Sequence, residues 1–331
     1  MSLEDDLRIA LHEHAAEPAP QRDLWAGVSS GVRRDRRRRA VLATGAAVVA
    51  ITAVATVPAI LAARDDRSAP IMPATPVPSV PSVPAVDWVW PIPAEQLFPR
   101  EPGWVPGGLG EPTATVMGAN RLLHYEQGES VLEAEVGPIE PSWESEGEED
   151  HAADVGGRPA TVRTASSFDG SKPGEQFVGV RWRVAAGDWM QVLSWGDRDE
   201  DEILRFAHEL KPGSGPGVPD DLAFALVPSG FSVQHQSEGS LCMAAPAVVA
   251  SERQPSGLCA YVVDEPYQPL AEAGPEHVTV AGRPATYYAD PARVDVDLGG
   301  GKTLNITWDA EAIPLTREEA LRFAEGVTVR G

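Results

Sequence analysis

The residues best suited to form a covalent link are Cys242 and Cys259, the only two cysteines of the chain. Each lies on a short apolar segment, and a loop containing Pro, Gly and Ser separates the two segments. An even number of cysteines in an oxidising compartment favours a disulfide, and two adjacent strands would place these residues opposite each other. A redox-active pair is less consistent with the sequence, because such sites use closely spaced cysteines. The sequence therefore predicts a structural cross-strand disulfide.

The segment 299–303 (GGGKT) is similar to the end of a phosphate-binding loop. That loop needs another glycine five positions before its last one, where this chain has Val296, and it needs a helix to follow. The residues after Thr303 instead alternate between apolar and polar, which is typical of a strand. We expect a hairpin turn here.

Seven acidic residues and no Lys or Arg occur between Glu140 and Asp154. A calcium loop needs carboxylates at fixed offsets around a glycine turn, and that spacing is absent. The seven histidines show no metal-ligand spacing, and the chain has no G-x-S-x-G nucleophile turn. We therefore expect a mobile, solvated acidic loop, no metal or other cofactor, and no enzymatic activity; an exported hydrolase is disfavoured.

Three sequence matches recur in the same order in the last two thirds of the chain. They pair 105–109 (VPGGL) with 227–231 (VPSGF), 155–161 (VGGRPAT) with 280–286 (VAGRPAT), and 204–207 (LRFA) with 321–324 (LRFA). Loop-length differences explain the changing offsets. The order and the quality of the matches predict two tandem copies of one domain, at residues 100–213 and 218–331.

Each copy is expected to consist of strands followed by one helix. Alternating residues over 178–195 and over 294–308 indicate two hairpins, which end on Trp195 and Trp308, both expected in the core. Capping boxes are expected before two apolar helical segments, Asp199 with Glu202 and Thr316 with Glu319. The predicted fold class is α+β, with each repeat an antiparallel sheet covered by one C-terminal helix.

Ahead of the repeats, an uncharged run from residue 40 to 63 follows a block of arginines. At about 1.5 Å per residue this run is long enough to cross a bilayer as a helix. Basic residues on its amino-terminal side predict a cytoplasmic N-terminus. The residues that would set this orientation are Arg33, Arg34, Arg36, Arg37, Arg38 and Arg39. A cleaved twin-arginine export signal, with Ala62 and Ala63 at the cleavage site, is the alternative to a single uncleaved transmembrane helix.

The remaining segments are a cytoplasmic head over residues 1–39 and a linker over residues 64–99. The head contains one amphipathic helical pattern near its start, suited either to a solvated tail or to docking of a cytoplasmic protein through residues 1–35. The linker is rich in proline, which favours an extended stalk. Trp88 and Trp90 near its end are expected to cap the first repeat, with a membrane-side or docking contact as the alternative.

The formal net charge of the chain is −22, and almost all of it lies after residue 67. An acidic region of this kind repels nucleic acid and anionic lipid head groups, so neither is an expected partner of the repeats.

The layout of residues 3–15, 24–39 and 40–63 resembles that of single-pass actinobacterial membrane proteins of the anti-sigma-factor-like kind. The resemblance implies a cell-membrane protein that transmits or sequesters signals, although the head has no cysteine for a His-Cys-Cys zinc motif. We therefore expect a non-enzymatic extracytoplasmic module that senses an envelope protein or ligand, with a possible cytoplasmic regulatory partner. The alternative is a stalked envelope protein with a structural or assembly role and no signalling.

Overall fold

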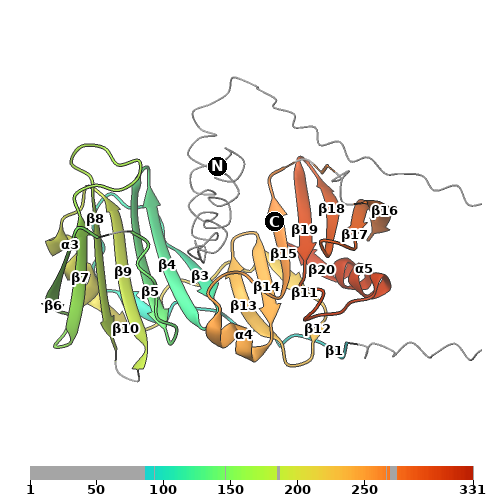
Figure 1. Cartoon of the computed structure of the whole chain (residues 1–331), viewed down its shortest axis with the longest axis horizontal. Coiled ribbons are helices and arrows are strands. Elements are labelled where there is room, and N and C mark those ends of the chain that lie inside the picture. Colours follow the sequence, from blue (N-terminus) through green and yellow to red (C-terminus); the bar gives the residue numbers. More distant parts are fainter. Residues whose placement is uncertain are drawn as a thin grey trace, which may run out of the picture. The chain divides into compact units, whose positions relative to one another are not determined.

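The structure, a computed structural model, describes residues 86–330 except 93, 146, 185–186, 266 and 269–273. This part of the chain is mostly β, with one antiparallel sheet of 14 strands and a few short helices (Figure 1). The predicted head, the arginines from Arg33 to Arg39 and the apolar run 40–63 lie outside the described residues. Among the residues that are described, no helix has the length and apolarity needed to cross a membrane.

The large sheet contains two sets of seven strands, and both sets follow the same order from the middle of the sheet outward. The first set is β3 (Thr113–Met117), β4 (Asn120–Gln127), β5 (Ser130–Gly137), β9 (Trp189–Gly196), β8 (Gln176–Arg183), β7 (Pro159–Ala165) and β6 (Glu149–Asp154). The second set is β13 (Ser232–Ser237), β14 (Ser240–Ala244), β15 (Leu258–Val263), β19 (Lys302–Thr307), β18 (Arg293–Gly299), β17 (Arg283–Tyr288) and β16 (Glu276–Val280). We call residues 100–213 the first half and residues 218–330 the second half.

The two sets are joined edge to edge in the middle of the sheet. β3 pairs antiparallel with β13, which places Val116 opposite Gln236 and Met117 opposite His235. The sequence predicts a sheet for each repeat and gives no sign that the sheets join. Each edge strand carries unpaired N–H and C=O groups, and the β3–β13 pairing satisfies part of one edge of each set.

Three two-stranded pairs accompany the large sheet. They are β1 (Trp88–Val89) with β12 (Val227–Pro228), β2 (Arg100–Pro102) with β10 (Leu210–Pro212), and β11 (Leu222–Phe224) with β20 (Val327–Val329). β1 belongs to the segment that the sequence assigns to the Pro-rich linker. The end of that segment is therefore part of the folded region rather than a spacer.

In the first half, α3 (Glu200–Glu209) packs its apolar side on the sheet. Asp199 is its N-cap, since the side chain accepts a hydrogen bond from Glu202 N at 2.9 Å, but only this half of the expected capping box is formed. Ile203 and Phe206 are fully buried in the core of this half. Phe206 meets Tyr125 of β4 edge to face, with ring centroids 6.1 Å apart. The predicted helix and its apolar face are confirmed.

In the second half, α5 (Arg317–Glu325) has the equivalent place. Thr316 and Glu319 form the predicted capping box at its start. Phe323 of α5 contacts Phe224 of β11 with ring centroids 5.0 Å apart, within the core of this half. A third helix, α4 (Pro246–Ser251), follows β14; the sequence analysis does not predict it.

The two tryptophans expected in the core differ in burial. Trp308 is 8% exposed and packs in the second core, where it continues the side-chain alternation of Leu304 and Ile306. Trp195 is only half-buried and packs beside Phe177 in a separate small cluster. The expectation was wrong for Trp195, because its position in β9 alternates with the core-facing residues instead of matching them.

The repeated 155–161 and 280–286 segments form matching two-residue hairpin turns. In the first, Gly156 and Gly157 both have positive φ, 61° and 79°. In the second, the equivalent residues are Ala281 at 47° and Gly282 at 77°. This geometry is costly for any residue with a Cβ. Ala281 is the only non-glycine residue with positive φ among the described residues.

We expect Ala281→Gly to raise the free energy of unfolding by about 0.5 to 1 kcal/mol. The change removes the left-handed penalty, and the greater freedom of glycine in the unfolded chain offsets part of the gain. The matched variant Gly156→Ala should lower stability by a similar amount, since its Cβ would enter open space and only the backbone would be strained. Urea unfolding measures both changes. Equal effects of the same sign would contradict this account.

Candidate functional site

The junction between the two halves concentrates buried polar contacts, and we take it as the candidate functional site. The β3–β13 pairing is continued by Gly118, whose N–H donates to Gln234 O at 2.6 Å. Gly118 has φ +62°, and a Cβ built on it would lie 2.1 Å from Glu252 O. Only glycine allows the backbone after α4 to approach the β3–β4 turn so closely.

Gln234 of β13 holds the segment after α4 in place. Its side chain is fully buried, and Nε2 donates to Glu252 O at 3.0 Å and to Gln254 O at 2.7 Å. Its Oε1 accepts from Ser256 N at 2.9 Å. These three bonds satisfy the buried amide and fix the loop that carries Arg253.

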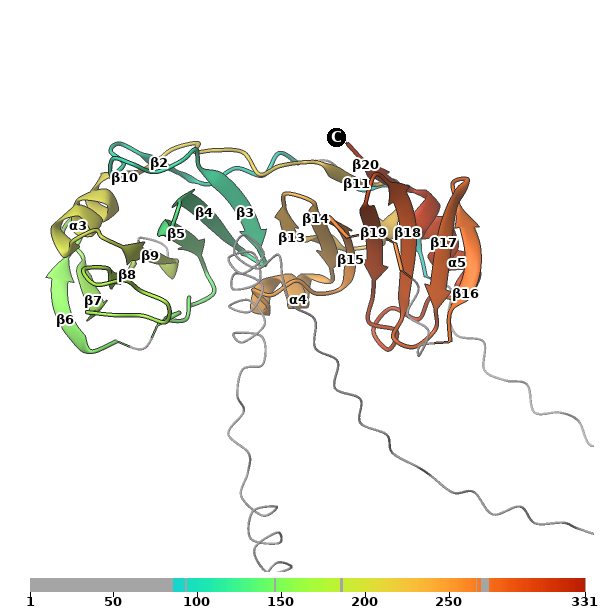
Figure 2. The ribbon, with the colours of Figure 1, turned by 90° about the horizontal axis from the view of Figure 1, so that it is seen from above.

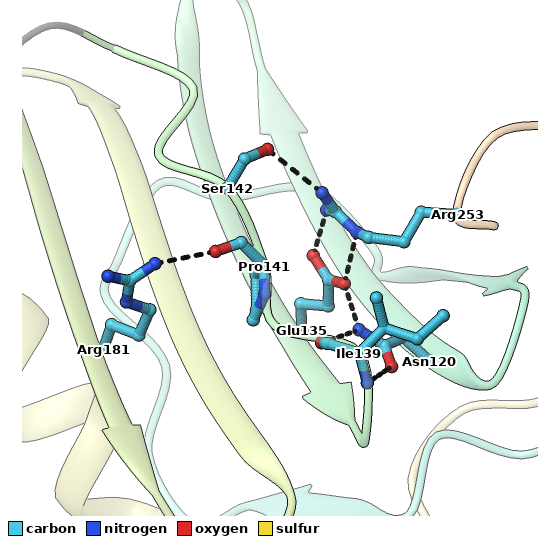
Figure 3. A network of polar contacts seen from close by, with 7 residues as sticks. All are labelled: Asn120, Glu135, Ile139, Pro141, Ser142, Arg181 and Arg253. Atoms are coloured by element: carbon cyan, nitrogen blue, oxygen red, sulfur yellow. Dashed lines mark hydrogen bonds and ion pairs between the residues drawn. The ribbon is translucent and has the colours of Figure 1, made fainter. Parts of the chain in front are cut away.

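Arg253 of the second half forms a buried ion pair with Glu135 of β5 in the first half (Figure 3). The contact is bidentate, with Nε to Oε1 at 2.9 Å and Nη2 to Oε2 at 2.5 Å. The Glu135 side chain is 4% exposed and that of Arg253 is 13% exposed. Asn120 Nδ2 also donates to Glu135 Oε1 at 2.6 Å. Because both charges are buried, removal of either side chain would leave the other charge in the protein interior without its partner.

The loop between β5 and β6 is fixed at the same place (Figure 3). Asn120 exchanges two hydrogen bonds with the Ile139 backbone, at 2.8 and 3.0 Å. Arg253 Nη1 donates to Ser142 Oγ at 3.1 Å, and Arg181 Nη1 donates to Pro141 O at 2.8 Å. Residues of both halves therefore determine the position of this loop.

The expectation of a mobile loop over Glu140–Asp154 was wrong for much of the segment, because arginines of the neighbouring strands bind it. Residues 149–154 form strand β6. Asp150 makes a bidentate ion pair with Arg163, both bonds at 2.7 Å, and this hydrogen bonding lowers the pKa of Asp150. The guanidinium groups of Arg163 and Arg181 both contact the ring of Trp143, at 4.8 and 4.5 Å from its centroid.

The chain that enters the folded region contacts both halves, and we call residues 86–99 the strap. At one end, Trp88 and Val89 pair with β12, and Trp88 stacks on Phe323 with centroids 5.8 Å apart. At the other end, Phe98 is fully buried in the first core. Trp88 therefore caps the second half and not the first, contrary to the sequence expectation, while Trp90 is 76% exposed.

The strap also pairs with the connector between the halves, residues 214–217. Phe98 N donates to Pro216 O at 3.0 Å, and Gly215 N donates to Phe98 O at 2.8 Å. Figure 2 shows the two segments running side by side between the halves. The halves are therefore linked by one strand pair, one buried ion pair and two antiparallel lengths of chain, with Leu97 opposite Gly217.

Cys242 and Cys259 form the predicted disulfide. They are directly opposite each other on β14 and β15, with Cα atoms 4.0 Å apart, and both are buried. The cross-strand prediction is confirmed. Such a bond is typical of proteins that fold in an oxidising compartment.

A second buried carboxylate lies in the second half. Asp295 of β18 is 2% exposed and is bound by Arg293 and by Asn305 Nδ2, the latter at 3.0 Å. Burial raises the pKa of Asp295 in spite of these partners. Among the described residues no group of three or more His, Cys, Asp or Glu side chains is placed to hold a metal ion.

We expect His235 of β13 to make the junction sensitive to acid. Burial lowers its pKa to about 4, and its Nδ1 is buried without a hydrogen bond partner. The unfolded chain has a histidine pKa of about 6.5 and binds the proton first, so stability falls as the pH drops from about 6.5 towards 4. We expect a loss of about 2 kcal/mol between pH 7.5 and pH 5 from this residue. His235→Gln should remove that part of the pH dependence in urea unfolding, and an unchanged profile would contradict the assignment.

The sequence predicts the disulfide but does not identify Arg253, Glu135 and Gln234 as contact residues. The available signal was weak: Glu135 interrupts an apolar strand, and Arg253 is a single basic residue in a Pro/Gly/Ser loop. Alternation predicts that Glu135 lies on the face away from the core, and it does. Alternation does not reveal a partner from the other half.

Comparison of the chain with models of protein families and with curated proteins finds no match.

Proposed function

We propose that the chain is a non-enzymatic, single-pass membrane protein whose region outside the membrane binds an envelope protein or ligand and signals to a cytoplasmic regulator. The observation that carries the proposal is the strap. The segment that follows the predicted span and stalk is fixed to the second half by Trp88 and to the first half by Phe98.

The strap physically connects the two halves, where the ligand would bind, with the predicted transmembrane helix. Because its two ends are attached to different halves, a change in how the halves meet would shift or release one end. A ligand drives such a change only if it binds one arrangement more tightly than another. The junction offers a discrete set of contacts to change: the β3–β13 pairing, the Arg253–Glu135 pair and the strap–connector bonds.

Other features support the finer organisation that we propose. The matching strand order and the matching helices α3 and α5 support two tandem repeats at residues 100–213 and 218–331. The disulfide supports a location outside the cytoplasm. The arginine block and the apolar run 40–63 support a span with the N-terminus inside, as does the resemblance to anti-sigma-factor-like membrane proteins.

The test is cross-linking in intact cells followed by purification through a tag at the C-terminus. We expect the full chain to capture a cytoplasmic protein, and a chain lacking residues 1–35 to lose it. If deletion of residues 1–35 changes neither the captured proteins nor the response of the cell, signalling fails and the structural or assembly role is favoured. A C-terminal tag that added protease cannot reach would contradict the proposed topology.

Trp88→Ala should uncouple the region outside the membrane from the captured partner. Loss of the stacking on Phe323 detaches one end of the strap, and we expect the yield of the cytoplasmic partner to change by at least about threefold, as about 0.7 kcal/mol of coupling would produce. Trp90→Ala is the matched control, because Trp90 is largely exposed and only two residues away. Equal effects of the two variants would argue against a role of the strap.

A further inference from the structure

A small pocket lies at the edge of the first core, away from the junction. It has a volume of about 120 Å³ and opens between the end of α3, the β6–β7 turn and β2. Its lining consists of an apolar floor and a basic rim. The floor is formed by the buried side chains Val155, Trp182, Met190, Ala207 and Leu210, and the rim by Arg100, Arg158 and His208.

The rim is unusual in a chain of net charge −22. Within the part of the chain that the structure describes, the guanidinium groups of Arg100 and Arg158 make no hydrogen bond or ion pair. His208 Nδ1 accepts from Gly156 N at 3.2 Å, so the neutral ring carries its proton on Nε2 and can donate from there. Among the described residues, these three side chains thus have hydrogen-bond donors without a protein acceptor, and they line one hollow that has apolar side chains at its floor.

The equivalent place in the second half has different residues. The strand pairings align Arg100 of β2 with Leu222 of β11, and the helices align His208 of α3 with Glu325 of α5. Arg158 corresponds to Arg283 of the repeated turn, and Arg283 Nη1 donates to Leu298 O at 2.6 Å. The basic rim is thus a property of the first half and does not follow from the fold itself.

We infer that this pocket binds the carboxylate of a small apolar acid. Guanidinium groups match a carboxylate through paired N–H donors, and the floor would take a compact hydrocarbon group. The volume is slightly below the ~150 Å³ of an engineered apolar cavity that takes benzene, which suits a short branched chain. The acid is either a free molecule or the C-terminal Val or Leu of a peptide, since both present the same chemistry. The inference deepens the proposed sensing role, and its biological meaning rests on that role.

The test is titration calorimetry of the full chain in detergent with 3-methylbutanoate, its neutral amide, and an acetylated peptide ending in valine. We expect the acid or the peptide to bind and the amide not to bind; the stronger of the two identifies the source. Arg100→Ala and Arg158→Ala should each weaken binding about tenfold or more, the loss of a charge-assisted hydrogen bond. Arg283→Ala is the matched control and should leave the affinity unchanged. Binding of inorganic phosphate as tight as that of the acid would overturn the inference, because the floor would then have no part.

A second measurement locates the ligand even if an arginine variant folds poorly. With ¹³C-methyl methionine labelling, the acid should shift the signal of Met190, which lines the pocket, and not that of Met243 in the second core. Ala207→Leu fills the floor without changing charge and should abolish the Met190 shift. No shift at Met190 with any probe overturns the inference. A failure of this inference can be told apart from a failure of the proposed function, because partner capture through residues 1–35 is measured without any acid.

Discussion

Replacing Arg253 with alanine should lower the free energy of unfolding by about 3 to 5 kcal/mol, the usual cost of removing one partner from a buried ion pair. The variant leaves the Glu135 carboxylate, 4% exposed, with Asn120 as its remaining side-chain partner in the network of Figure 3. Because Arg253 also joins the halves, we expect the two halves to unfold together in the wild-type protein and in two separate transitions in this variant. Tryptophan fluorescence in urea measures this well, since every tryptophan except Trp25 lies within residues 86–330.

Two controls separate the buried charge from other effects of the substitution. Arg330 forms an ion pair with Asp220 in which both side chains are more than half exposed, so Arg330→Ala should cost less than about 1 kcal/mol. The double variant Arg253→Met with Glu135→Leu removes both charges and should recover most of the lost stability. If Arg253→Ala costs no more than Arg330→Ala, the junction is not held by this pair.

The elements that the sequence predicts well are those fixed by neighbouring residues. The capping box of Thr316 and Glu319 and the glycine turn at 299–301 depend on side chains within a few positions, and the structure has both. The disulfide could also be predicted from the sequence, because two cysteines allow only one pairing. In each case the physical cause acts over a short stretch of chain or leaves a single choice.

The features that the sequence does not reveal depend on contacts between distant segments. The β3–β13 pairing joins residues about 120 positions apart, and nothing in either strand marks it as an inner rather than an outer strand. Trp88 lies closer in sequence to the first half yet packs on Phe323 of the second. The pocket likewise unites β2, the β6–β7 turn and α3, and the two arginines of its rim carry no local pattern.

Removal of the disulfide should have the next largest effect, about 3 kcal/mol for the double variant Cys242→Ala with Cys259→Ala. The bond closes a loop over 17 positions, and the chain-entropy model gives this value for a loop of that length. Urea unfolding of the double variant beside the wild-type protein measures the loss. If the wild-type protein is unfolded, reduced and refolded, its free energy of unfolding should be lower by the same amount. The reductant should not change the free energy of unfolding of the double variant.

The first half provides an internal comparison for this bond. Its hairpin aligns Leu122 with Cys242, and the residue opposite Leu122 is Glu135, as Cys259 is opposite Cys242. The position that holds Cys259 of the disulfide in the second half therefore holds Glu135, the partner of Arg253, in the first half. Loss of the disulfide should weaken the second half by itself, whereas loss of Arg253 should weaken the union of both. Two outcomes would contradict this division of roles. One is that the two halves unfold separately in the cysteine variant, and the other is that reduction of the wild-type protein exposes no new thiol.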